Sequence, residues 1–218
     1  MKTYLVAGLG TFGAEVARYL FQAGYEVVGI DSDRLVVQEL KDSLTDAIVG
    51  DATDIETLKE IGVEDVDTAI VSLGNKMEAS ILCVLHLKEL KVRNIIAKAI
   101  NEDHKKILEA LGADEIVFPE KDMAIRVARR IVSPNVIDYL PLTSEYIIVE
   151  AAPPEEWIGN SLRELNLRKR YEINIIAIKQ MVPEKFLAIP DADYVIKESD
   201  ALIILGREDS LAALKIKA

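Results

Sequence analysis

The chain has 218 residues, half of them hydrophobic, so it can bury the core of one large domain or of two modest ones, and disorder is excluded. Acidic residues outnumber basic ones by 37 to 26, the formal net charge is −11, and no run of Lys and Arg could follow a phosphate backbone, which argues against nucleic acid as a partner. The single cysteine, Cys83, cannot form an internal disulfide and indicates a reducing compartment, and no apolar run approaches the length of a membrane span.

Six strand–helix units are predicted along the first part of the chain. We expect strands at residues 3–7, 26–30, 47–49, 68–72, 94–98 and 115–118, and helices at residues 12–22, 35–41, 55–61, 77–90, 102–111 and 122–132. Short apolar strands that alternate with helices are typical of a parallel sheet covered on both faces. The predicted fold class is therefore α/β, a doubly wound, six-stranded parallel Rossmann sheet with its ligand crevice at the carboxyl ends of the strands.

The pattern changes after the sixth unit. Pro134 interrupts helical continuation, and residues 138–144 are predicted to form a linker. Beyond it we expect strands at residues 146–150, 173–178, 193–196 and 201–205, with helices at residues 161–165 and 208–214. The sequence thus predicts two domains, a nucleotide-binding domain at residues 1–138 and a smaller α+β domain at residues 139–218.

A glycine motif follows the first strand. It reads Gly8-Leu-Gly10-Thr-Phe-Gly13, and the second strand ends in Asp31. In a dinucleotide-binding βαβ unit, the first glycine allows a tight turn, the second lets backbone N–H groups approach a pyrophosphate, and the third lets helix and strand pack closely. The helix start favours a phosphate, and Asp31 is placed to accept hydrogen bonds from ribose hydroxyls. The motif therefore predicts a site for an adenine nucleotide (ATP, ADP or AMP) or for NAD(H).

Two more turns face the same crevice. Their residues are Gly50, Asp51, Ala52 and Thr53 after the third strand, and Ser72, Leu73 and Gly74 after the fourth. In this fold the first turn borders the adenine and its ribose, so Asp51 could hydrogen-bond the base edge. Alternatively, the segment Asp51–Asp54 merely caps the next helix, because Asp and Thr are favoured there. The second turn would close over the ligand from the opposite side, although a glycine after a strand is usually only a turn.

Two charged residues lie at or just after the ends of the fifth and sixth strands. Lys98 closes an otherwise apolar run and could neutralise phosphate charge, or it could extend from the strand end to solvent. Glu120 lies just past the sixth strand and could meet a magnesium ion on a bound triphosphate. The alternative for Glu120 is an acid in the first turn of a helix.

The sequence offers no recognisable catalytic set. Only two histidines exist, His86 and His104, and neither has a Cys, His or Asp cluster at metal-ligand spacing, so zinc is unsupported. No Ser-His-Asp set, Cys-x-x-Cys motif or Walker lysine motif is visible. Hydride transfer needs an acid or base that faces the nicotinamide, and the second unit offers no such arrangement. We therefore predict a nucleotide sensor that is not an enzyme, with a small NAD-dependent oxidoreductase as the alternative.

Taken together, these residues resemble the RCK family of regulators of potassium conductance, also called KTN. The closest likeness is to TrkA/KtrA-type regulatory subunits of bacterial and archaeal potassium uptake systems. The matching segments are 6–13 (VAGLGTFG), 30–33 (IDSD), 50–53 (GDAT), 80–90, 95–99 (IIAKA), 104–114 (HKKILEALGAD), 118–123 (FPEKDM) and 173–178 (INIIAI). The resemblance adds Thr11, Phe12, Ser32 and Asp33 to the predicted nucleotide site.

The resemblance implies an RCK N-domain and a smaller RCK C-domain. Such subunits dimerise through the helices after the fifth strand and form an octameric ring of identical or paralogous subunits. The ring docks on the cytoplasmic face of a Trk- or Ktr-type potassium-translocating membrane protein, so the implied location is cytoplasmic and peripheral to the membrane. Relatives bind ATP, ADP, AMP or NAD(H), and the nucleotide shifts the population between two ring shapes and so gates the pore.

One position departs from the family pattern. Thr11 stands where ATP-sensing relatives often carry an arginine aimed at the terminal phosphate, and Lys98 or an arginine of a neighbouring subunit could compensate. A third hypothesis is therefore a structural ring subunit with a vestigial nucleotide site. Some relatives also bind cyclic di-AMP between C-domains, and Arg168 and Asn174 lie in the comparable segment.

Overall fold

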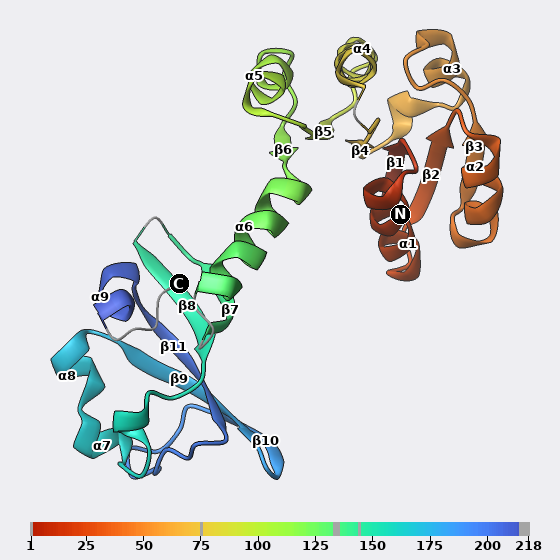
Figure 1. Cartoon of the computed structure of the whole chain (residues 1–218). Coiled ribbons are helices and arrows are strands. Elements are labelled where there is room, and N and C mark those ends of the chain that lie inside the picture. The colour runs from red at the N-terminus through yellow and green to blue at the C-terminus, as the bar shows by residue number, and fades with distance from the viewer. Residues whose placement is uncertain (1, 75, 133–135, 144, 214–218) are drawn as a thin grey trace. The chain divides into compact units, whose positions relative to one another are not determined.

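The computed structural model describes residues 2–74, 76–132, 136–143 and 145–213 (Figure 1). The chain divides into two compact units, Met1–Glu120 and Lys121–Ala218, and each is described by itself.

The first unit is built on a six-stranded sheet with the strand order β3-β2-β1-β4-β5-β6, and all neighbouring strands are parallel. The strands are β1 (Thr3–Ala7), β2 (Glu26–Asp31), β3 (Asp46–Val49), β4 (Thr68–Val71), β5 (Asn94–Lys98) and β6 (Glu115–Val117). The doubly wound sheet predicted from the sequence is therefore confirmed.

Helices connect these strands in the expected order. They are α1 (Thr11–Gln22), α2 (Arg34–Leu40), α3 (Ile55–Glu60), α4 (Met77–Glu89), α5 (Glu102–Ala110) and α6 (Pro119–Val132), with short 3₁₀ helices at Lys41–Ser43 and Val63–Asp65. Successive side chains of a strand point to opposite faces of the sheet, so β1 contributes side chains to two hydrophobic cores. Leu5 packs in one core with residues of α3, α4 and α5, while Val6 packs in the other with residues of α1 and α2.

The strand order places a crevice beside β1. Because β2 lies on one side of β1 and β4 on the other, the chain crosses over in opposite directions from this point. The loops after β1 and β4 therefore diverge at the carboxyl ends of the strands, which is where doubly wound sheets bind their ligands.

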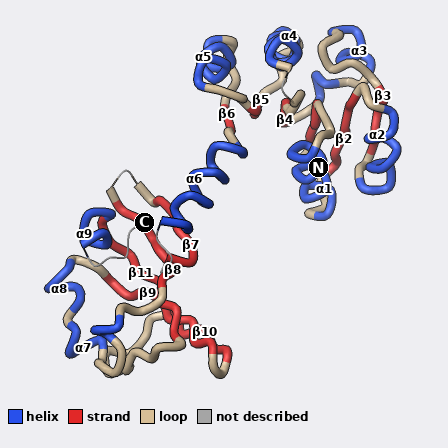
Figure 2. The backbone as a smooth tube through the Cα atoms, viewed as in Figure 1, coloured by secondary structure: helices blue, strands red, loops and turns tan. Residues whose placement is uncertain are grey.

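The second unit is an antiparallel sheet of order β10-β9-β11-β8-β7 (Figure 2). Its strands are β7 (Val136–Pro141), β8 (Tyr146–Ala151), β9 (Asn174–Met181), β10 (Glu184–Ala188) and β11 (Asp200–Arg207), and its helices are the 3₁₀ helix Glu155–Trp157, α7 (Leu162–Leu165), α8 (Leu167–Tyr171) and α9 (Glu208–Ala213). Ile147, Val149 and Ala151 alternate along β8 on its buried face, where they share a core with Trp157.

Two expectations for this unit were wrong. The linker predicted at residues 138–144 is partly strand, because residues 138–141 belong to β7 and pair with β8. Pro141 ends this strand at the sheet edge, a position where the missing N–H does no harm. The strand predicted at residues 193–196 is also absent from the described structure. Asp191 accepts a hydrogen bond from the Asp193 N–H (2.9 Å), which makes a turn, and only one bridge, Ser161 to Val195, forms there.

Other differences are omissions. Neither α8 nor β10 was expected from the sequence, because these short segments lack a clear hydrophobic period. Pro134 and Leu214 lie outside the described residues. The two compact units divide between residues 120 and 121, and the family domain boundary at residues 138/139 stays a prediction.

Candidate nucleotide-binding site

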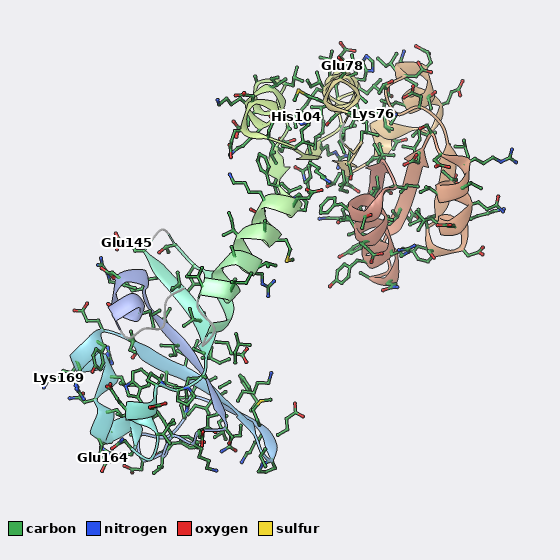
Figure 3. All side chains as sticks on the ribbon, viewed as in Figure 1. Lys76, Glu78, His104, Glu145, Glu164 and Lys169 are labelled. Atoms are coloured by element: carbon green, nitrogen blue, oxygen red, sulfur yellow. The ribbon has the colours of Figure 1, made fainter. Side chains whose placement is uncertain are left out.

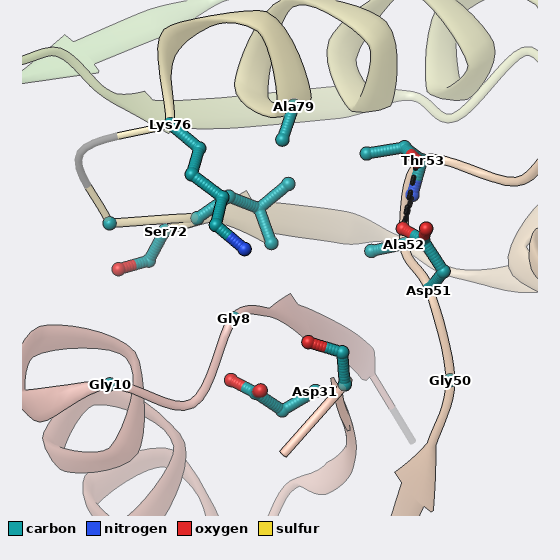
Figure 4. A pocket seen from close by; sticks show the side chains of 13 residues that line it. Gly8, Gly10, Asp31, Gly50, Asp51, Ala52, Thr53, Ser72, Lys76 and Ala79 are labelled. Carbon is teal, nitrogen blue, oxygen red and sulfur yellow. Dashed lines mark hydrogen bonds between the residues drawn. The ribbon is translucent and has the colours of Figure 1, made fainter.

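A cleft of about 240 Å³ opens at the carboxyl ends of the first four strands (Figure 4). Its described lining is Gly8, Gly10, Asp31, Ser32, Gly50, Asp51, Ala52, Thr53, Ser72, Leu73, Gly74, Lys76 and Ala79. The four turns that the sequence places at the crevice therefore meet in one cavity, as expected.

The turn from β1 into α1 depends on two glycines. Gly8 has φ +92°, and a Cβ on it would lie 2.2 Å from the backbone oxygen of Ser72. A Cβ on Gly13 would lie 1.9 Å from the backbone oxygen of Gly8. A side chain at either position would thus collide with backbone, which confirms the tight turn and the close helix packing expected there.

The start of α1 is left open toward the cleft. The first helical hydrogen bond runs from the Ala14 N–H to the Gly10 oxygen (2.8 Å), and no side chain caps the helix. The N–H groups of the first turn therefore have no partner within the helix. A Cβ on Gly10 would meet no atom within 4 Å, so the approach to these N–H groups is unobstructed. Backbone donors at a helix start suit an anionic ligand group such as a phosphate.

Asp31 ties the ends of β1 and β2 together. Its Oδ2 accepts from the Leu9 N–H (2.7 Å) and its Oδ1 accepts from the Asp33 N–H (2.9 Å). Each carboxylate oxygen can accept a second hydrogen bond, so the side chain can still receive a ribose hydroxyl. Asp33 itself points elsewhere, because it caps α2 by accepting from the Leu35 N–H (2.9 Å).

In the turn after β3, one residue caps the next helix and others line the cleft. Asp54, not Asp51, caps α3, accepting from the Glu56 N–H (3.2 Å). Hydrogen bonds from the Thr57 hydroxyl and from this N–H lower the pKa of Asp54. Asp51 Oδ1 accepts from the N–H (2.9 Å) and the hydroxyl (2.8 Å) of Thr53, and both residues line the cleft. The alternative that residues 51–54 cap the next helix is therefore confirmed for Asp54, while Asp51 and Thr53 line the cleft.

Gly50 lines the cleft as expected, whereas Lys76 and Ala79 line it although the sequence did not suggest them as site residues. Figure 4 shows the side chain of Lys76 reaching into the cleft. The sequence did carry a signal for it. Lys76 stands between the Ser72–Gly74 turn and the start of α4, where a positive charge opposes the helix dipole. An anion bound nearby would offset this unfavourable interaction.

Six predicted site residues do not line this cleft: Thr11, Phe12, Gly13, Asp33, Lys98 and Glu120. Thr11 is the exposed first residue of α1, and Phe12 packs against the core beneath it. Lys98 and Glu120 form an ion pair, in which the lysine side chain is 10% exposed and the glutamate 70%. The Lys98 ammonium lowers the pKa of Glu120 by donating a hydrogen bond to its carboxylate. Their role in nucleotide binding stays a prediction.

The described lining contains no His, Cys or Tyr. His104, on α5 in Figure 3, is buried, and burial lowers its pKa. Within residues 2–74, 76–132, 136–143 and 145–213, no group of three or more His, Cys, Asp or Glu side chains could hold a metal ion. None of the helices in the described segments has both the length and the apolar composition to cross a membrane.

Comparison with known proteins covers both units. Family models for the TrkA-N domain and the TrkA-C domain match residues 4–119 and 146–215. The chain is 43% identical over 205 residues to the Ktr system potassium uptake protein C of Bacillus subtilis (strain 168), covering 94% of this chain and 92% of that protein. It is 35% identical over 210 residues to the Ktr system potassium uptake protein A of the same organism, covering 96% and 94%.

Among solved structures, the GsuK channel superposes with a TM-score of 0.70 at 19% identity, covering 100% of this chain and 40% of that chain. The GsuK channel bound to NAD gives a TM-score of 0.65 at 19% identity, covering 98% and 39%. This chain thus spans about 40% of the channel's length. At this identity the likeness concerns the fold alone.

Proposed function

This chain belongs to the family that joins a TrkA-N domain to a TrkA-C domain, the RCK family that its motifs resemble, and we propose that it is a regulatory subunit of a potassium uptake system. One observation carries the proposal. The alignment with Ktr system potassium uptake protein C extends over 94% of this chain at 43% identity, so it spans both units, and the TrkA-N match over residues 4–119 includes the glycine-rich turn.

We propose that the cleft binds an adenine nucleotide (ATP, ADP or AMP) or NAD(H). In this arrangement the phosphates approach the N–H groups at the start of α1, and Asp31 accepts from the ribose hydroxyls. Asp51, Ala52 and Thr53 border the base. The volume of about 240 Å³ is below the roughly 300–1,000 Å³ common for ligand sites, which favours a mononucleotide or one half of a dinucleotide.

The proposed role is binding without catalysis. The described lining offers carboxylates, hydroxyls and Lys76 as side-chain polar groups, and the proposal of binding alone rests on the likeness to the Ktr system potassium uptake proteins, not on this lining. A ligand acts as a regulator when it binds one conformation of an assembly more tightly than another. A small NAD-dependent oxidoreductase is the alternative, and consumption of NADH with a metabolite panel would favour it.

The proposed assembly rests on family membership. We propose that the subunits dimerise through the helices after β5 and form an octameric ring with themselves or with a paralogue. The ring would sit at the cytoplasmic side of a Trk- or Ktr-type membrane protein. Cyclic di-AMP is a further proposed ligand of the second unit, where Arg168 and Asn174 are exposed.

A thermal-shift panel of ATP, ADP, AMP, NAD and NADH tests the nucleotide proposal. Ligand at a hundred times its Kd stabilises a protein by about 2.7 kcal/mol, which raises Tm by roughly 5–11 °C for a chain of this size. The variant Asp31→Ala should weaken binding at least about tenfold, because the ribose loses an acceptor and the Leu9 and Asp33 N–H groups lose theirs.

Asp46→Asn is the matched control, since Asp46 is exposed at the amino end of β3, opposite the cleft. Equal affinities of the Asp31 variant and the wild type in calorimetric titrations would remove Asp31 from the site. The transport role is tested by growth on limiting potassium of a bacterial strain that lacks its own uptake regulators and expresses a Ktr-type membrane protein. No growth difference with and without this chain would contradict that role.

A further inference from the structure

The cleft carries an unbalanced set of charges. Asp31 and Asp51 contribute two carboxylates, and Lys76 is the only Lys or Arg among the described lining residues. An anionic ligand that enters the cleft therefore meets two like charges. Backbone N–H groups can hold a phosphate, but they bring no full positive charge against these carboxylates.

Lys76 is held in place by its backbone. The Lys76 N–H donates to the Leu73 oxygen (3.4 Å), and the Lys76 oxygen accepts from the Ser80 N–H (3.1 Å) as α4 begins. Figure 4 shows the ammonium directed into the cleft. Of the carboxylates in the described residues, none forms an ion pair with this ammonium. The side chain is exposed, so its charge is available to a ligand.

Its position at the start of α4 is unfavourable without an anion. A positive charge there repels the N-terminal end of the helix dipole, and α4 has no side-chain cap. Glu78 in the first turn, labelled beside Lys76 in Figure 3, offsets this in part. An anion in the cleft would be attracted both by the open N-terminus of α1 and by Lys76.

The other candidate cation is already engaged. Lys98 pairs with Glu120 and does not line the cleft. Thr11, at the start of α1, brings no charge. Among the described residues that line the cleft, Lys76 on the α4 side is therefore the one that offers a positive charge to the phosphates.

Resting on the nucleotide site proposed above, we propose that Lys76 binds the phosphate groups of the nucleotide and sets a preference for a diphosphate over an uncharged nucleoside. The ligand class is an adenosine diphosphate unit, either free ADP or the pyrophosphate half of NAD. Lys76 acts here as a binding residue that fixes specificity through charge.

The test is calorimetric titration of the full chain with adenosine, AMP and ADP, at low and at high salt. Lys76→Gln should weaken ADP binding about tenfold, because a charged hydrogen bond is lost, and adenosine binding less than about twofold. Lys76→Arg should restore most of the ADP affinity. The salt dependence of the ADP Kd should flatten in the Gln variant, because one screened charge is gone.

Lys41→Gln is the matched control, since Lys41 is an exposed lysine at the end of α2 that does not line the cleft. If Lys76→Gln binds ADP as the wild type does, or loses adenosine and ADP affinity by the same factor, the role of Lys76 is overturned while the nucleotide site stands. If the folded wild type binds none of the three ligands, the nucleotide site itself fails and the role of Lys76 fails with it.

Discussion

Gly13 is the position where a single methyl group tests the geometry of the site most directly. It is buried in α1, and an added Cβ would lie 1.9 Å from the Gly8 backbone oxygen and 3.3 Å from a methyl group of Val6. Contacts under 3.0 Å do not occur for real Cβ atoms, so α1 or the β1 turn must move by about 1 Å. The obstacle is backbone, which cannot turn aside as a flexible side chain can.

The magnitude follows from two opposing terms. Overpacking costs about 1–3 kcal/mol, with backbone collisions at the upper end, while replacing glycine by alanine inside a helix gains about 1 kcal/mol. We expect Gly13→Ala to lower the free energy of unfolding of the chain by about 2 kcal/mol. That corresponds to a Tm lowered by roughly 4–8 °C, measured by calorimetry or circular dichroism.

Gly10→Ala is the matched variant in the same motif. Its Cβ would meet nothing within 4 Å, so the free energy of unfolding should fall by less than about 1 kcal/mol. The methyl group would instead project into the cleft and weaken nucleotide binding about tenfold or more. A Gly13→Ala protein with the wild-type Tm, or a Gly10→Ala protein less stable than Gly13→Ala, would refute the packing described for this turn.

Three further predictions concern other groups. Lys98→Met should raise the pKa of Glu120 toward 4.5, which carboxyl NMR titration would measure. Because the ion pair lowers this pKa, the pair stabilises the fold above pH 4.5, and that stabilisation is lost as the pH falls through the lowered pKa. An unchanged titration of Glu120 would contradict the ion pair. Burial raises the pKa of Cys83 to about 12, so a thiol reagent at pH 8 should label the folded protein only after denaturant is added, and rapid labelling would contradict the burial. Asp200→Ala should cost the second unit about 1–3 kcal/mol in urea unfolding, because the buried carboxylate accepts from the Tyr194 hydroxyl (2.8 Å), and a loss below about 0.5 kcal/mol would show that this contact is not needed.

The sequence by itself determined the first unit and the core of its site. The hydrophobic residues of strands and amphipathic helices recur at short, regular spacings that can be read directly from the sequence. The strands of the first sheet therefore begin and end close to where they were expected. The structural roles of Gly8 and Gly13 could also be predicted from the sequence. Gly8 has a positive φ and Gly13 lies close to another backbone segment, and both conditions favour glycine. The edge strand β7, which ends in a proline, and the short strand β10 carry no such period, and they were missed or misread.

Only the tertiary structure decided which charged side chains line the cleft and which pair with each other. Lys98 and Glu120 lie 22 positions apart, and folding pairs them with each other instead of placing them in the described cleft. Asp31 proved to hold the Leu9 and Asp33 N–H groups as well as face the cleft, and Lys76 entered the site from the start of α4. The partner of a charged side chain is set by which strand and helix ends meet in space. Local sequence fixes the backbone element that carries such a group, and packing of distant elements fixes what the group touches.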